Sequence, residues 1–112
     1  MSRTIFGQIP SKSNGYRFGK GRVYKSSEVK QYEADFAKQW VRTDTIEGYF
    51  ELTAIVYFRS DRSDLDGALK CTLDMLQKVG AIKNDNKCIK LHFEKRIDKA
   101  NPRIELTLKK VI

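Results

Sequence analysis

The 112-residue sequence has two cysteines, one histidine and no long apolar run. Cys71 and Cys88 are too few and too far apart for a zinc site or a disulfide framework, so we expect two small buried apolar side chains. The longest apolar run, residues 52–58, is far too short to cross a bilayer. The first ten residues lack the apolar core of a signal peptide, and we expect a cytoplasmic protein with no membrane partner.

The sequence also lacks several motifs of catalysis. It has no nucleophile–base pair and no phosphate-binding glycine motif, which argues against acyl chemistry, nucleotide hydrolysis and a nucleotide cofactor. The single histidine, His92, stands on the polar face of an expected strand, with no metal-ligand spacing around it. We interpret His92 as a surface residue.

Positive charge is abundant. The chain has 22 lysines and arginines against 14 acidic residues, a formal net charge of +8. This balance favours a polyanionic partner, and nucleic acid fits best. An anionic membrane surface would call for a basic amphipathic helix, which is lacking. Charge alone carries no specificity, so a protein that is merely basic stays an alternative.

The hydrophobic periodicity predicts one domain over residues 1–112 of class α/β (α+β), with a mixed four-stranded sheet packed against two main helices. The expected order is strand, helix, strand, helix, strand, strand. The expected elements are a strand at 3–9, a loop at 11–25, a helix from Ser26 or Ser27, a central strand at 49–58, a helix ending near Val79 with Gly80 as its C-cap, and two strands joined by a hairpin at Asn101-Pro102.

The first of these two final strands is expected to have distinct faces. The alternation places one apolar set opposite one polar set, Ile89, Leu91, Phe93 and Ile97 against Cys88, Lys90, His92, Glu94 and Arg96.

Residues 11–25 form the expected basic, glycine-rich loop. Glycines permit bends, and basic side chains can hold phosphates. The candidate DNA-binding residues are Lys12, Arg17, Lys20, Arg22 and Lys25 in this loop and Arg62 further along. The aromatic residues among them, at 16, 18 and 24, either stack on exposed bases or fold onto the core.

The stretch 62–74 carries the strongest signal for chemistry. At about 100° per residue, Asp66, Lys70 and Asp74 share one flank of a helix. Asp64 lies near the helix start, where it either caps the helix or turns toward the same cleft as Asp66. A structural alternative is an acidic N-cap followed by i,i+4 ion pairs on a solvated face. Asp85 follows the helix and joins the cleft only if the chain folds back.

This pattern resembles the RusA family of Holliday-junction resolvases over roughly residues 9–110. The resemblance rests on an Asp-x-Asp helix start, a lysine four residues later and an acidic turn beyond the helix, and it is supported by the segments Ile9-Pro10-Ser11-Lys12-Ser13-Asn14 and Tyr24-Lys25-Ser26. Two positions depart from the family. Gly67 stands where asparagine is usual, and Asn84 stands where a second acid is frequent.

The resemblance implies a homodimeric, metal-dependent crossover junction endodeoxyribonuclease that cuts four-way DNA junctions with Mg²⁺ or Mn²⁺. It implies the catalytic residues Asp64, Asp66, Lys70 and Asp85, of which the three aspartates hold metal. Clustered carboxylates suit hard divalent cations, and Lys70 could contact the scissile phosphate or the attacking water. Asp74 and Asn84 are candidates for a supporting role, with Asp74 expected to pair with Lys70. The alternative is a non-catalytic, structure-selective DNA-binding protein on the same fold.

The basic segment generates a first testable prediction. Affinity for branched DNA should fall steeply with salt, because lysine and arginine contacts release counterions from the phosphates. Neutralising Lys20, Arg22 and Lys25 together should weaken binding and flatten the salt dependence in a gel-shift titration. Unchanged affinity in this triple variant would place the DNA-binding surface elsewhere.

Overall fold

The computed structural model describes residues 1–10, 16–19, 22–25 and 27–111, with only the backbone described at 16–19 and 22–25. In these ranges the elements run β1 (Ser2–Phe6), β2 (Tyr16–Gly19), β3 (Arg22–Lys25), α2 (Ser27–Gln39), β4 (Phe50–Phe58), α3 (Leu65–Lys78), the 3₁₀ turn η1 (Asp85–Lys87), β5 (Cys88–Ile97) and β6 (Arg103–Lys110). None of the described helices has the length and apolar character needed to cross a membrane.

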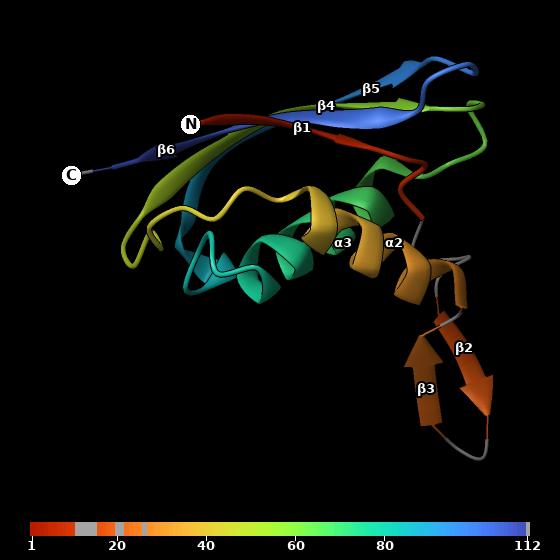
Figure 1. Cartoon of the computed structure of the whole chain (residues 1–112), viewed down its shortest axis with the longest axis horizontal. Coiled ribbons are helices and arrows are strands. Elements are labelled where there is room, and N and C mark those ends of the chain that lie inside the picture. Colours follow the sequence, from red (N-terminus) through yellow and green to blue (C-terminus); the bar gives the residue numbers. More distant parts are fainter. Residues whose placement is uncertain (11–15, 20–21, 26, 112) are drawn as a thin grey trace.

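A four-stranded sheet of order β1-β6-β4-β5 forms one layer, and α2 and α3 together cover one of its faces (Figure 1). β4 lies inside the sheet, antiparallel to β6 and parallel to β5. Its alternate residues are buried under the helices, Phe50, Leu52, Ala54, Val56 and Phe58. The predicted mixed four-stranded sheet with two main helices in a single domain is confirmed.

The last two strands differ from the expected hairpin. β5 and β6 do not pair with each other but lie on opposite sides of β4. The turn between them crosses the end of β4, where the Asp98 N–H donates to the Phe58 carbonyl at 2.8 Å. α3 is a helical crossover, which makes β5 parallel to β4. The chain then passes the end of β4, and β6 lies between β4 and β1, where it is hydrogen-bonded on both sides.

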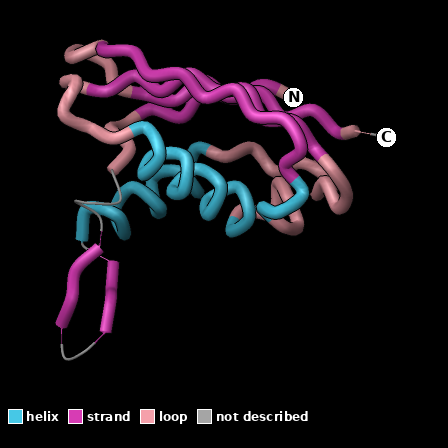
Figure 2. Tube along the Cα trace, turned by 180° about the vertical axis from the view of Figure 1, so that it is seen from behind, coloured by secondary structure: helices cyan, strands magenta, loops and turns pink. Residues whose placement is uncertain are grey.

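The expected loop at 11–25 also needs correction. Residues 16–19 and 22–25 form an antiparallel pair, β2 with β3, in a second small sheet. Figure 2 shows this hairpin projecting from the body formed by the sheet and the helices. Half of these eight residues are aromatic or β-branched, Tyr16, Phe18, Val23 and Tyr24, which favours strand here over loop. The segment remains basic and glycine-rich, but part of it has regular structure.

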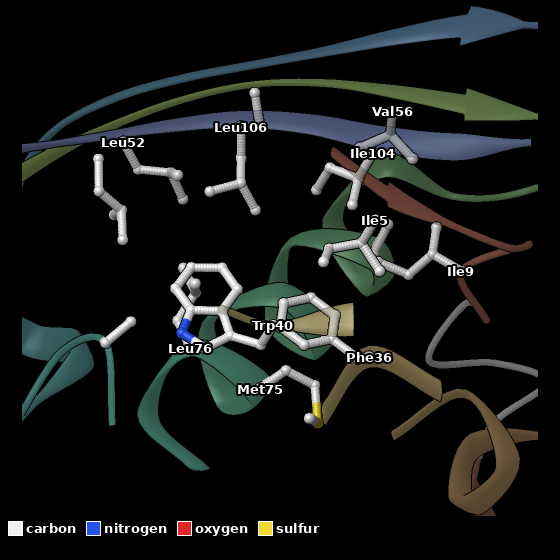
Figure 3. Packing of buried hydrophobic residues seen from close by; sticks show 14 of the residues in the cluster. Ile5, Ile9, Phe36, Trp40, Leu52, Val56, Met75, Leu76, Ile104 and Leu106 are labelled. Atoms are coloured by element: carbon white, nitrogen blue, oxygen red, sulfur yellow. The ribbon is translucent and has the colours of Figure 1, made fainter. Parts of the chain in front are cut away.

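The core lies between the helices and the sheet (Figure 3). Phe36 of α2 and Trp40, which directly follows α2, stack with ring centroids 5.7 Å apart, and Met75 and Leu76 of α3 are buried beside them. The side chains at helical spacing in α2, Val29, Tyr32 and Phe36, therefore face the core. In α3 the fully buried face contains Ala68, Thr72, Met75 and Leu76, while Leu65, Leu69 and Leu73 lie partly buried at its edge.

The end of α3 agrees with the sequence. Gly80 has a φ of +80°, in the left-handed region that glycine adopts without a steric penalty, and the Val79 N–H donates to the Met75 carbonyl at 2.9 Å. The helix thus ends where predicted and turns the chain toward η1 and β5. Cys71 and Cys88 form no disulfide, and both are half-buried beside the core.

Candidate active site

The loop from Arg59 to Asp64 carries the chain from β4 to α3 and presents the first aspartate. Asp64 occupies the N-cap position with extended backbone angles, φ −86° and ψ 134°, but its side chain makes no cap hydrogen bond. The carboxylate is exposed. An N-cap aspartate normally accepts from the first turn, and here that interaction is not made. The acidic group is therefore available to a ligand.

Asp66 lies in the first turn of α3 and is also exposed. Its Oδ1 accepts a hydrogen bond from the Gly67 N–H at 3.0 Å. The partial positive charge of the helix N-terminus stabilises carboxylates at this end. Two exposed carboxylates thus stand at one helix start.

Lys70 lies one turn beyond Asp66, and Asp74 one turn further. Lys70 is exposed and Asp74 is half-buried. Within the described ranges, no ion pair joins Lys70 to either Asp66 or Asp74. The expected pairing of Asp74 with Lys70 is not formed. Among the described residues, neither the Asp64 cap hydrogen bond nor the i,i+4 ion pairs of the structural alternative are made, and the local contact of the acidic pair is the one between Asp66 and the Gly67 N–H.

Asp85 lies at the opposite end of α3. It begins η1, is exposed, and its N–H donates to Gln77 Oε1 at 3.1 Å. The neighbouring Asn84 caps this turn, accepting from the Asn86 N–H at 3.4 Å. Figure 1 shows α3 running from the end of the molecule that carries the β2–β3 hairpin toward the opposite end, where η1 lies.

The three predicted metal-binding aspartates therefore do not come together in one chain. A helix of 14 residues is about 20 Å long at a rise of 1.5 Å per residue, so Asp85 is far from the helix start. In the part of the chain that the structure describes, no three histidine, cysteine or acidic side chains are grouped to hold a metal ion. The cleft that would need the chain to fold back over α3 is not formed, because the chain enters β5 instead.

Two side chains that the sequence did not single out hold the loop before Asp64. Gln8 accepts from the Arg59 N–H at 3.0 Å and donates to Ser63 Oγ at 3.4 Å. Lys95 donates to the carbonyls of Asp61 and Ser63. A signal for Lys95 was present, because the apolar alternation of residues 91, 93 and 97 is interrupted at 95. No comparable sequence signal marks Gln8.

A groove of about 670 Å³ lies beside this loop, between the end of β1 and the start of α2. Its lining includes Glu28 and Asp35 as well as Arg59, so its charge is mixed and does not favour phosphate. Tyr32 lies at its inner wall. Burial raises the Tyr32 pKa well above its ordinary value, so this hydroxyl stays neutral.

The predicted DNA-binding residues are placed unevenly. Arg62 is exposed in the loop beside Asp64, and its N–H donates to Ser60 Oγ at 3.4 Å. Arg17, Arg22 and Lys25 lie on the β2–β3 hairpin, of which the backbone is described, and Lys12 and Lys20 fall outside the described residues. Their contact with DNA stays a prediction. His92 is exposed beside Glu94, as expected of a surface residue.

Comparison with known proteins gives the family. The profile of endodeoxyribonuclease RusA matches residues 7–109. The chain belongs to the RusA family. The crossover junction endodeoxyribonuclease RusA of Aquifex aeolicus (strain VF5) is 36% identical over 94 residues, covering 79% of this chain and 74% of that protein. The resemblance found in the sequence is confirmed, and so is the expected enzyme class, an endodeoxyribonuclease.

The position of Asp64 generates a stability prediction for this RusA family member. An N-cap aspartate replaced by alanine normally costs about 1 kcal/mol of stability. Because the Asp64 side chain makes no cap hydrogen bond, Asp64→Ala should cost less than about 0.5 kcal/mol in urea unfolding. If Asp64→Ala lowers the stability by the full value of about 1 kcal/mol, Asp64 acts as a helix cap.

Proposed function

We propose that this chain resolves four-way DNA junctions by paired phosphodiester hydrolysis, depends on Mg²⁺ or Mn²⁺, and acts as a homodimer. The observation that supports the proposal most is the pair Asp64 and Asp66. Both carboxylates are exposed at the start of α3, and Asp64 has no cap bond. They lie at the end of the molecule from which the basic β2–β3 hairpin projects. The name of the Aquifex aeolicus relative, 36% identical, supports the junction as substrate.

The oxygen atoms that Asp64 and Asp66 offer decide which metal ions the site could hold. Two aspartates separated by one residue offer the oxygen ligands that Mg²⁺ and Mn²⁺ prefer, but among the described residues of one chain no third carboxylate is grouped with them. When bound, the cation supplies charge neutralisation at the phosphate and a water of lowered pKa. The ammonium of Lys70, exposed one turn beyond Asp66, is suited to contact a phosphate.

A homodimer follows from two features. A four-way junction resolved by paired cuts requires two symmetric sites, which a two-fold dimer provides. Asp85 is exposed and stands about 20 Å along α3 from Asp64 and Asp66 in its own chain. If Asp85 serves the same site, it must come from the partner subunit. The acidic site would then contain all three aspartates only in the dimer.

Asp66→Asn tests the role of the acidic pair. The change keeps the side-chain size and removes the charge that attracts a divalent cation, so junction cleavage should fall by orders of magnitude. Junction affinity in Ca²⁺ or chelator should hold or rise slightly, because a negative charge near the phosphates is lost. Gel assays of cleavage in Mg²⁺ and of binding in Ca²⁺ measure the two effects.

Asp44→Asn is the matched control, since Asp44 is equally exposed but lies in the loop between α2 and β4. It should leave both cleavage and binding unchanged. If Asp66→Asn cuts at the wild-type rate, the acids have no part in hydrolysis. If the wild-type protein binds junctions but never cuts them in Mg²⁺ or Mn²⁺, the alternative of a non-catalytic, structure-selective DNA-binding protein holds.

Mixed dimers test whether Asp85 acts across the interface. Asp66→Asn and Asp85→Asn proteins should each be inactive alone. Refolded together they should regain nicking, because the heterodimer then contains one site with all three wild-type aspartates. Absence of recovery would mean that Asp85 serves its own subunit or neither site. Light scattering of the mixture should report a dimer. A monomer that cleaves junctions would contradict a site shared between two subunits.

A further inference from the structure

Lys95 occupies an unusual position in the sheet. In the β4–β5 register it stands opposite Val56, between the positions that pair with Ala54 and Phe58. Residues paired in this way share a face of the sheet, so the side chain of Lys95 starts on the face that the helices cover. It is half-buried. A charged residue in an otherwise apolar row requires a polar partner for its ammonium.

The partners of Lys95 are main-chain carbonyls of the β4–α3 loop. Its Nζ donates to the Asp61 carbonyl at 2.7 Å and to the Ser63 carbonyl at 2.8 Å. The ammonium lies 5.8 Å from the centre of the Phe58 ring, over which the side chain reaches the loop. Charge-assisted hydrogen bonds of this length are among the stronger ones in proteins.

No described carboxylate forms an ion pair with Lys95. The Lys95 ammonium thus binds main-chain carbonyls of the loop rather than a neighbouring carboxylate. Ser63, whose carbonyl it binds, immediately precedes Asp64, and Asp66 follows two residues later. The Lys95 hydrogen bonds therefore act on the last residue before the acidic pair.

Gln8 holds the same loop from another strand. Its side-chain amide accepts from the Arg59 N–H and donates to Ser63 Oγ, so it joins the first part of the loop to its last part. Gln8 follows β1, whereas Lys95 belongs to β5, and these are the two edge strands of the sheet. The loop that presents Asp64 is thus anchored by side chains from both edges.

We propose that Lys95 is a positioning residue for the Asp64–Asp66 site. It fixes the backbone of residues 61–63 and with it the direction in which both carboxylates point. This inference rests on the proposed function, because those carboxylates must act on DNA for their direction to matter. Residues that orient metal-binding side chains through hydrogen bonds typically contribute 10- to 100-fold to activity or metal affinity.

The test compares Lys95→Met, which keeps the apolar stem and removes the donor, with Lys95→Arg, which keeps the charge and several donors. Lys95→Met should lower kcat for junction cleavage about 10- to 100-fold and raise the Mg²⁺ concentration needed for half-maximal cleavage. Junction affinity in Ca²⁺ should not change, and Lys95→Arg should recover much of the lost rate. Lys90→Met is the matched control, because Lys90 is an exposed lysine of the same strand, paired with Glu51.

Hydrogen exchange of the protein without metal or DNA gives a second measurement that does not depend on activity. In Lys95→Met the amides of residues 59–64 should exchange faster, while those of α2 and β4 stay protected and show that the protein folds. If the wild-type protein fails to cut junctions but the loop still loosens in Lys95→Met, the proposed function fails and the anchoring role of Lys95 stands.

Two outcomes would overturn the role of Lys95. One is a Lys95→Met protein that cuts at the wild-type rate and the wild-type Mg²⁺ requirement. The other is weaker junction binding with a flatter salt dependence and unchanged exchange of the loop, which would make Lys95 a direct phosphate contact.

Discussion

The parallel pairing of β4 with β5 is the constraint on which the rest of the structure depends. The carboxyl ends of two neighbouring parallel strands lie side by side, so the helix that connects the strands must run back along one face of the sheet. The loop after β4 therefore meets the last part of β5, which brings Lys95 to the carbonyls of Asp61 and Ser63. By the same geometry, the start of β5 and the preceding Asp85 lie near the amino-terminal end of β4, at the opposite end of the strands.

The separation of Asp85 from Asp64 and Asp66 is thus a property of the crossover. No loop rearrangement shortens a packed helix of 14 residues, whose buried face includes Ala68, Thr72 and Leu76. One chain can present two acids at one end and one acid at the other.

The sequence was informative where the signal is local. The hydrophobic periodicity predicted the central strand at 49–58, and Gly80 marked the end of α3. The helix-start motif, with Asp64 and Asp66, indicated the family. These features depend on neighbours within a few residues, so a single sequence is enough to reveal them.

The sequence was less informative where the outcome depends on long-range pairing. Asn101-Pro102 marks a turn, but a turn does not say which strand lies beside which, and β6 passed over β4 to its free side. The expected cleft around Asp85 required a spatial relation that spacing cannot give. Lys95 was visible as a break in an apolar row, but its partners are carbonyls, which have no identity in sequence.

The anchoring of the β4–α3 loop also constrains the order in which the molecule can become complete. The hydrogen bonds from Lys95 close sequence separations of 34 and 32 residues, and the one that the Arg59 N–H donates to Gln8 closes 51. Contacts of such separation carry a loop-closure entropy that packing elsewhere must offset. The acidic loop therefore keeps this geometry only where the end of β5 and the segment after β1 are already in place. Fraying at the end of β5, an edge strand, would loosen it again while the core beneath the helices stays intact.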